Sequence, residues 1–510
     1  MTLNGYMSDD LTPILVGAGQ FTQRDVEPDQ ALEPVDMMAE ASRRAAMDAG
    51  TTPRSNILES VDSVSVVNIL GWNYRNAPGL LSARLGISPR ETIYSTVGGN
   101  TPQWFVNETA DRIASGKVRV ALLAGAEALY SYHRARKAGV WLDWSKGGDG
   151  DPTVAGEDRM GSTAEEMSHG LQMPIQIYPL FENALRAHRG LSINEHRRYL
   201  GSLCSSLSSV VSNNPYAWFR DPRTEECLTV VSEDNRYIAF PYTKYMNAII
   251  TVDQSAALIM TSVSAARALG IHPERWVFLH GSGDAHDLWY VTQRQNYYSA
   301  PALRLAGEKA LTMARISIDE VDYLDLYSCF PCAVQIGRSM LGISEEDSRP
   351  LTVTGGLACH GGPGNNYTMH AIATMTSKLR SDPGSKGLVT GMGWYLTKHS
   401  VGVYSSEPPA RAWRRERPEN YQPLIDRSKH PVFESRPDGR ADVETYTVLF
   451  NREGRPEKGI VIGRLADHSR FVANTPDDEE LLREFVDAEA VGRRGRVTPG
   501  PDGVNQFTPQ

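Results

Sequence analysis

The chain has 510 residues, of which 41% are hydrophobic and 22% are charged. This length exceeds the size at which a single hydrophobic core stops growing, so we expect more than one domain. The net charge of −9 argues against nucleic acid as the main partner, because phosphate binding needs clustered Lys and Arg. The five cysteines are sparse, and residues 1–20 show neither a signal peptide nor a long apolar span. We expect a cytoplasmic protein with free thiols and no membrane partner.

The first half of the chain alternates β-branched runs with amphipathic stretches. Strands are expected at residues 13–17, 61–69, 92–97 and 118–124, with helices at 35–49 and 101–115. This alternation predicts an α/β domain with a mainly parallel sheet. Residues from about 130 to 230 differ, with many Met and aromatic residues and short helices expected at 179–188 and 193–208. We interpret this segment as an insertion that covers one face of a sheet.

The pattern of the first half returns after the insertion. Strands are expected at residues 249–261, 277–281, 323–326 and 387–390, with helices at 301–314 and 368–379. A glycine turn at Gly98 and Gly99 opens one helix, and a denser glycine turn at residues 355–366 opens another. Each of these helices leads to a strand that ends in glycine. The recurrence predicts an internal duplication.

The composition changes again from residue 407. A charged linker is expected at residues 408–420, followed by alternating strands at 443–450, 459–465 and 470–474. An acidic helix is expected at residues 477–488, begun by Pro476. The predicted organisation is an N-terminal half at 1–270, a C-terminal half at 271–407, the linker, and a small β-rich domain at 421–510.

Four stretches in fixed order carry a resemblance to a known family. These are residues 96–102, 250–257, 324–330 and 355–363. They resemble, in turn, the nucleophile loop, the aspartate-bearing strand entry, the Asn-Glu-Ala-Phe or His-Asp-Cys-Phe loop and the Gly-His-Pro loop of the thiolase superfamily. With its extra domain, the chain resembles actinobacterial thiolase-like proteins of type 1, often labelled acetyl-CoA acetyltransferases. The resemblance covers residues 12–406.

The resemblance implies a fold and a ligand. The fold is a duplicated α/β thiolase fold of two βαβαβαββ halves in five αβαβα layers, with an inserted loop domain and a small C-terminal barrel of the oligonucleotide-binding type. The ligand is acyl-CoA, bound as a CoA thioester substrate, with no permanently bound cofactor. Thiolases are commonly dimers, but this chain leaves monomer and homodimer both open. Nucleic-acid binding by the last domain is a lesser alternative, suggested by its barrel resemblance and by Arg493, Arg494 and Arg496.

The departures from the thiolase pattern concern the covalent mechanism. Gly98 stands where thiolases have the cysteine that is acylated, a residue chosen because a thiolate is a strong nucleophile and a good leaving group. Gly362 stands where the Gly-His-Pro loop has its histidine. The late catalytic cysteine falls on or near Met392. The residues of an acyl-enzyme mechanism are therefore absent or displaced.

Three side chains remain as catalytic candidates. Tyr327 either gives a hydrogen bond or a proton to an oxygen, acts as a base if its pKa is lowered, or is a half-buried aromatic residue. Cys329 matches the cysteine of the His-Asp-Cys-Phe loop and is either an acid or base or a small apolar residue. His360 lies in the second glycine turn, where its imidazole could reach a substrate.

The two glycine turns supply candidate thioester-binding residues. Gly98 and Gly362 form the cradle that the resemblance implies. Asn100 and Asn366 stand at the mouths of the turns, where their side chains either cap a helix or orient a thioester carbonyl. His370 is interpreted as a polar core residue. No metal site stands out, because the Cys-x-x-Cys pair at residues 329–332 has no second pair.

Three functions are compatible with these residues. The preferred one is cleavage or formation of a C–C bond in an acyl-CoA through a stabilised enolate, without an acyl-enzyme, because retro-aldol reactions produce enolates and thiolase-like aldolases of steroid side-chain breakdown use tyrosines near these loops. The second is a non-catalytic protein that binds acyl-CoA as a scaffold. The third is conventional thiolase activity, which Gly98 disfavours.

Overall fold

The computed structural model describes residues 10–50, 56–500 and 502–510. The strands of the first half are β1 (Pro13–Thr22), β2 (Ser63–Val66), β3 (Glu91–Ser95), β4 (Val120–Ala128), β5 (Thr153–Ala155) and β8 (Asp253–Ser262). Those of the second half are β9 (Val277–His286), β10 (Tyr323–Asp325), β11 (Lys386–Gly393) and β12 (Lys398–Ser405). Together they form one ten-stranded sheet in the order β10-β11-β12-β9-β1-β8-β4-β2-β3-β5.

The two halves of this sheet repeat one strand order. The series β2-β4-β8-β1 in the first half corresponds to β10-β11-β12-β9 in the second, and the directions of the paired strands agree as well. The halves join where β1 pairs with β9, at Leu15 and Val277 among others. The predicted internal duplication is confirmed.

The sheet as a whole is mixed. In the first half, where a mainly parallel sheet is expected, β2 with β3, β2 with β4 and β3 with β5 are parallel, and β8 pairs antiparallel with β1 and β4. In the described part of the second half, β10 pairs in parallel with β11, and the pairings of β12 with β11 and β9 are antiparallel. In the second half, residues 394–397 join β11 directly to β12. So short a connection requires antiparallel neighbours, which the alternation of strands and helices does not reveal.

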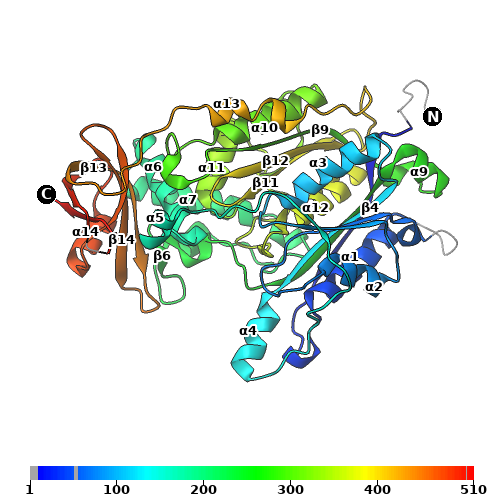
Figure 1. Cartoon of the computed structure of the whole chain (residues 1–510), viewed down its shortest axis with the longest axis horizontal. Coiled ribbons are helices and arrows are strands. Elements are labelled where there is room, and N and C mark those ends of the chain that lie inside the picture. Colours follow the sequence, from blue (N-terminus) through cyan, green and yellow to red (C-terminus); the bar gives the residue numbers. More distant parts are fainter. Residues whose placement is uncertain (1–9, 51–55, 501) are drawn as a thin grey trace.

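Helices cover both faces of the two half-sheets. The outer helices are α1 (Pro34–Asp48), α2 (Ala77–Leu85) and α9 (Val263–Ala268) in the first half, and α10 (Pro301–Ala314) and α11 (Pro331–Met340) in the second. The helices α3 (Thr101–Ala114) and α12 (Tyr367–Ser381) contact each other and strands of both halves. They form the central layer of the expected five-layer arrangement (Figure 1).

A close strand-to-helix contact is repeated in both halves. It joins Gly17 to Ala45 and Gly19 to Ala41 in the first half, and Gly281 to Ala310 and Gly283 to Ala306 in the second. At each glycine an added Cβ would lie between 2.0 and 2.2 Å from the helix carbonyl oxygen. A Gly-x-Gly strand therefore lies directly on an Ala-x-x-x-Ala helix twice in the chain, where only glycine lets the two backbones approach.

The insertion between β4 and β8 is mostly helical. It contains α4 (Leu129–Ala138), α5 (Ala164–Ser168), α6 (Pro174–His188), α7 (Ile193–Ser208), α8 (Glu225–Thr229), β6 (Tyr237–Ala239) and β7 (Tyr242–Thr243). The helix α6 begins five residues before the expected start, so Pro179 lies inside it. Short 3-10 helices occur at Pro28–Gln30, Ile57–Ser60, Val211–Asn213, Lys244–Met246, Pro273–Arg275, Val291–Gln293, Ile318–Glu320 and Pro418–Asn420.

The C-terminal strands close into a small barrel. They are β13 (Gly439–Phe450), β14 (Pro456–Leu465), β15 (Arg470–Asn474), β16 (Arg494–Thr498) and β17 (Gln506–Pro509), preceded by α13 (Pro423–Asp426). Because β13 pairs with both β14 and β16, the five strands form a ring, which confirms the expected barrel. The acidic helix α14 (Glu479–Asp487) starts after its N-cap Asp478 and not at Pro476.

The insertion connects the barrel to the rest of the molecule. Strand β6 pairs with β13 and, with β7, extends the barrel sheet. Asn183 of α6 donates its side-chain N–H to the carbonyl of Tyr446, at 2.9 Å. Figure 1 shows the barrel at one end of the molecule, with α5, α6 and α7 between it and the large sheet. Among the described residues, no helix is long and apolar enough to cross a bilayer.

Candidate functional site

The two glycine turns meet at the N-termini of α3 and α12. The Gly98 N–H donates to Oδ1 of Asn365 at 3.0 Å, and the Thr368 hydroxyl donates to the Gly99 carbonyl at 3.0 Å. Turns that are more than 250 residues apart in sequence therefore form one structure. The duplication brings them together because each turn occupies the equivalent position in its own half.

Asn100 and Asn366 hold the N-cap positions of α3 and α12, but neither side chain caps its helix. The Asn100 Nδ2 donates to the Ser400 hydroxyl at 3.2 Å, and the Asn366 Nδ2 donates to the Gly125 carbonyl at 2.7 Å. Both Oδ1 atoms are buried and have no hydrogen-bond donor among the described residues. The side chains therefore do not act as helix caps, and two buried amide oxygens are left without a donor among the described residues.

Lys398, the first residue of β12, fills the space beside Gly98. A Cβ on Gly98 would lie 2.7 Å from the Lys398 Nζ and 2.7 Å from the Asn100 Oδ1. The Lys398 amine donates a hydrogen bond to the Val97 carbonyl. Burial lowers the pKa of Lys398 to about 8, while Glu157 acts in the opposite direction. The amine thus lies where a side chain at position 98 would extend.

Tyr327 follows β10 and faces the first glycine turn. A Cβ on Gly99 would lie 2.3 Å from the Tyr327 hydroxyl oxygen, and the Tyr327 N–H donates to the Thr390 hydroxyl at 2.8 Å. The side chain is only 7% exposed. Burial raises the pKa of Tyr327, which is opposite to the shift that a base would need. The phenol keeps its proton and is suited to donate a hydrogen bond.

Cys329 lies two residues further along, next to Tyr178 of the insertion helix α6. Burial raises the pKa of Cys329 to about 12, so it is a neutral thiol at pH 7. The Tyr178 hydroxyl also lies 3.3 Å from the Met392 sulfur, at the position expected for the late cysteine of thiolases. All five cysteines are free.

His360 is completely buried in the second turn. Its Nδ1 lies 3.3 Å from the Gly361 carbonyl, and its ring lies 5.0 Å from that of His370 and 5.7 Å from that of Tyr367. Burial lowers the pKa of His360 to about 4, which makes it neutral at pH 7. The ring of Tyr367 also contacts Tyr327, at 5.6 Å, so Tyr367 links the two predicted catalytic residues.

The remaining residues of the second turn have backbone or core partners. The Gly362 N–H donates to the Ile249 carbonyl at 2.8 Å, and the nearest atom to a Cβ at Gly362 would be the Leu357 Cδ2, at 3.2 Å. The His370 Nδ1 bonds with the Gln20 side chain at 2.8 Å. His370 is therefore a polar core residue, as expected. The catalytic and thioester-binding roles of the predicted residues stay predictions.

Two comparisons bear on the family of this chain. Residues 420–503 match the family model of the thiolase-like protein type 1 additional C-terminal domain. The whole chain is 33% identical to a monomeric SCP2-thiolase like protein type 1 from Mycobacterium smegmatis, over 98% of this chain and 100% of that chain, with a TM-score of 0.85. This chain belongs to the SCP2-thiolase-like protein type 1 family.

More distant structures share the thiolase fold of this SCP2-thiolase-like protein. An Ltp2-ChsH2(DUF35) aldolase is 18% identical with a TM-score of 0.59, over 79% of this chain and 99% of that chain. The acetyl-CoA acetyltransferase from Syntrophomonas wolfei is 15% identical with a TM-score of 0.54, over 78% of this chain and 99% of that chain. No curated protein matches the chain. The resemblance seen in the sequence is confirmed.

Glu127, near the end of β4, is a further polar residue of this SCP2-thiolase-like site and was not among the expected ones. It is fully buried, and its carboxyl accepts the N–H groups of Leu70 at 2.6 Å and Gly71 at 2.9 Å. A Cβ on Gly364 of the second turn would lie 2.3 Å from its Oε1. Burial raises the pKa of Glu127 to about 7. The sequence signal for Glu127 was an acidic residue within an apolar strand. The signal for Lys398 was a single lysine directly before a run of buried residues.

The Glu127→Gln variant is expected to change how stability depends on pH. The folded-state pKa of about 7 exceeds the value of 4.5 for a glutamate in solvent. The stabilisation by the bound proton is therefore complete below pH 4.5 and is lost as pH rises through 7. Relative to Glu127→Gln, the wild type should lose about 3 kcal/mol of unfolding free energy between pH 4.5 and 8. Urea unfolding at both pH values measures this difference.

The exposed Glu457→Gln variant serves as the control, because its carboxyl is in solvent in the folded protein as well. It should follow the wild type at both pH values. If the unfolding free energy of Glu127→Gln changes with pH as that of the wild type does, the Glu127 carboxyl does not bind a proton between pH 4.5 and 8. Burial then does not raise its pKa.

Proposed function

We propose that this protein binds CoA thioesters and makes or breaks a C–C bond through a stabilised enolate, without a cysteine acyl-enzyme. The observation that carries the proposal is the exchange at position 98, where glycine leaves no nucleophile and the Lys398 amine fills its space. A glycine cannot be acylated by a thioester. Enolate chemistry, by contrast, needs only hydrogen-bond donors for the oxyanion and a group that carries a proton.

In this proposal the turn residues bind the thioester and the buried side chains stabilise the enolate. Tyr327 donates its phenol hydrogen to the thioester oxygen, where negative charge develops. Asn100 and Asn366 orient the thioester within the cradle of Gly98 and Gly362. Cys329, held as a neutral thiol, gives a weak hydrogen bond to the same oxygen. The His360 ring packs against the Tyr367 ring, and the Tyr367 ring packs against the Tyr327 ring.

The proposed substrate is a β-hydroxyacyl-CoA, cleaved to an aldehyde or ketone and a shorter acyl-CoA. A small cavity of about 20 Å³ adjoins the second glycine turn, and in this proposal it widens to take the acyl chain. It is largely apolar, with Cys204, Leu207 and Leu228 of the insertion facing Gly355, Gly356 and Leu357. The fold shared with an Ltp2-ChsH2(DUF35) aldolase is compatible with this chemistry.

We also propose that the protein is a monomer, as the M. smegmatis relative is described. Strand β5 pairs with β3 and covers what would otherwise be the edge of the first half-sheet. Strand β5 is itself the new edge, and because it has only three residues it offers few backbone groups to a second copy.

The Tyr327→Phe variant tests the proposed function. Loss of the donor to the oxyanion should reduce the cleavage of a β-hydroxyacyl-CoA by about 100-fold or more, with little change in thioester binding. Chromatography with mass detection of the shorter acyl-CoA measures the rate. The matched control is Tyr323→Phe, four residues earlier, whose hydroxyl bonds with the exposed Asp382 at 2.9 Å.

Each result distinguishes between the candidate functions. Unchanged cleavage in Tyr327→Phe would remove Tyr327 from the mechanism. Binding of CoA thioesters without turnover of any of them by the wild type would favour the scaffold alternative, which the low exposure of Tyr327 and Cys329 also favours. Formation of acetyl-CoA from acetoacetyl-CoA and CoA would indicate a conventional thiolase.

A further inference from the structure

We propose that Lys398 is the acid–base residue of this site, and that its amine moves a proton between the β-hydroxyl and the α-carbon of a β-hydroxyacyl thioester. The inference rests on the proposed function. It names the proton carrier that the proposed reaction requires, at a position that neither the sequence motifs nor the family resemblance singles out.

The side chain of Lys398 is held in a channel between two glycines. Its Cε would lie 2.9 Å from a Cβ on Gly98 and equally 2.9 Å from a Cβ on Gly393. The absence of side chains at both positions therefore provides the space for the lysine. The channel ends beside Asn100, whose amide oxygen has no protein donor, and the amine is brought to the mouth of the first glycine turn.

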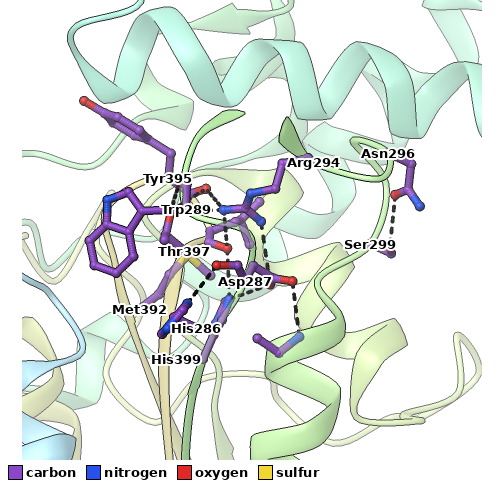
Figure 2. A network of polar contacts seen from close by, with 12 residues as sticks. His286, Asp287, Trp289, Arg294, Asn296, Ser299, Met392, Tyr395, Thr397 and His399 are labelled. Atoms are coloured by element: carbon purple, nitrogen blue, oxygen red, sulfur yellow. Dashed lines mark hydrogen bonds and ion pairs between the residues drawn. The ribbon is translucent and has the colours of Figure 1, made fainter. Parts of the chain in front are cut away.

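The turn that carries Lys398 is fixed from two sides. Arg294 donates to the carbonyls of Tyr395 and Leu396, both at 2.9 Å, and to the Thr397 hydroxyl at 3.0 Å. Figure 2 shows Arg294 directed at Tyr395 and Thr397 of this turn, with Asp287 between Arg294 and His399. The guanidinium is buried, so these bonds do not compete with water. Arg294 is a positioning residue for Lys398.

The other side of the same turn is held by Tyr178. Its hydroxyl donates to the Trp394 carbonyl at 2.8 Å and accepts the Leu396 N–H at 3.3 Å. Trp394 and Leu396 both have positive φ, at 53° and 56°, which is costly for side-chain-bearing residues. A turn held in this conformation from two sides gives Lys398 one fixed direction.

Burial makes the neutral form of the Lys398 amine, which can accept a proton, easier to reach than it is for a lysine in solvent. The charged groups near it are few: Glu157, after β5, acts on it from one side, and the Asp287, Arg294 and His399 group lies around the preceding turn. Glu157 is exposed and its effect is outweighed by burial, which lowers the pKa to about 8. The Val97 carbonyl accepts one N–H, which leaves the lone pair of the neutral amine free.

The step balances within the site. In the cleavage direction the neutral amine takes the proton of the substrate's β-hydroxyl, the C–O double bond forms and the bond between the α- and β-carbons breaks. The electron pair of that bond moves into the thioester enolate. The ammonium then returns the same proton to the α-carbon. The products are an aldehyde or ketone and a shorter acyl thioester, the amine is neutral again, and no water or redox partner is consumed.

Substitution of Lys398 in the full chain tests this inference. With a 3-hydroxyacyl-CoA as the probe, Lys398→Gln should lower kcat by about 100-fold or more and change KM by less than about threefold. Lys398→Arg should be as inactive, because a guanidinium does not release its proton. The wild-type kcat should rise with pH to a plateau, with an apparent pKa near 8 that both variants lack. Lys386→Gln, at the far end of β11, is the matched control.

A second measurement does not depend on turnover. Acetic anhydride labelling followed by peptide mass spectrometry, repeated across pH, should label Lys398 at lower pH than Lys386. Pre-incubation with a non-cleavable acyl-CoA thioether should protect Lys398 and leave Lys386 reactive. This readout holds even if Lys398→Gln fails to fold, since it uses the wild-type protein.

The outcomes separate the inference from the proposed function. If the wild type cleaves the substrate and Lys398→Gln is as fast, with the same pH profile, the inference is overturned and the proposed function stands. If the wild type cleaves no β-hydroxyacyl-CoA, the proposed function is overturned, and the acid–base role with it. Labelling of Lys398 and Lys386 at the same pH, without protection by the thioether, also overturns the inference.

Discussion

Replacement of Gly283 by alanine is expected to destabilise the protein by about 3 kcal/mol. Gly283 lies on β9 against α10, and an added Cβ would lie 2.1 Å from the Ala306 carbonyl oxygen and 2.9 Å from its carbon. These are backbone atoms of a helix, so no side chain can rotate away. The helix has to move off the sheet, which breaks the packing between β9 and α10 along its length. Urea unfolding measures the free energy.

The matched control for this variant is Gly337→Ala, in the helix α11. There the nearest atom to an added Cβ is the Leu303 Cδ2 at 3.7 Å, an ordinary contact distance. Alanine should be neutral at this site or stabilise the helix by up to about 1 kcal/mol. Equal unfolding free energies for the two variants would show that α10 moves away from β9 at little cost. The close strand-to-helix contact would then not contribute to stability.

The second large effect is expected at Arg415, within the charged segment that joins the C-terminal half to the barrel. Its guanidinium donates to Glu108 at 2.9 Å and to Asp111 at 3.1 Å, and it also pairs with the buried Asp284. Burial raises the pKa of Asp284 and the Arg415 charge opposes this shift. Arg415→Met should cost about 3–5 kcal/mol, because it leaves a buried carboxylate without its counter-ion.

The control for Arg415→Met is Arg414→Met, one residue earlier, since the Arg414 side chain is exposed. It should change the unfolding free energy by less than about 0.5 kcal/mol. Adding Asp284→Asn to Arg415→Met removes the unpaired charge and should recover part of the loss. If the double variant is no more stable than Arg415→Met alone, the buried charge is not the cause of the destabilisation.

Arg415 also shows that the linker segment is not a free tether. The Trp413 indole N–H donates to Asp111 at 2.6 Å, so two neighbouring residues of the segment are bound to α3. The composition, rich in charge and proline, indicates exposure. The structure differs because one of those charges meets three carboxylates that belong to α3 and β9, and the sequence gives no sign of that encounter.

The candidate site was partly predictable from the sequence. A feature could be predicted where it depends on residues close together in the chain. The glycine turns, the missing nucleophile at Gly98 and the neighbourhood of Tyr327 are read from short stretches, because glycine and the surrounding pattern have local meaning. The roles of Asn100 and Asn366 were not decided locally. Whether an amide caps its own helix or bonds with Ser400 or Gly125 depends on what the opposite half places within reach.

Lys398 and Glu127 were missed for the same physical reason. A lysine at the start of a strand usually extends into solvent, and an isolated glutamate gives no direction. Lys398 reaches Gly98 only because β11 and β12 form a hairpin beside the first turn. Glu127 approaches Gly364 only because the two halves face each other.

The sequence by itself determined the family, the duplicated α/β fold, the C-terminal barrel and the loss of an acylatable cysteine, since each depends on residue type and order along the chain. Only the tertiary structure decided that the Lys398 amine and the Asn100 amide lie beside Gly98. It also decided that burial keeps Tyr327 protonated and His360 neutral. Those properties follow from desolvation and from contacts between the two halves, and both arise only when distant segments are brought together.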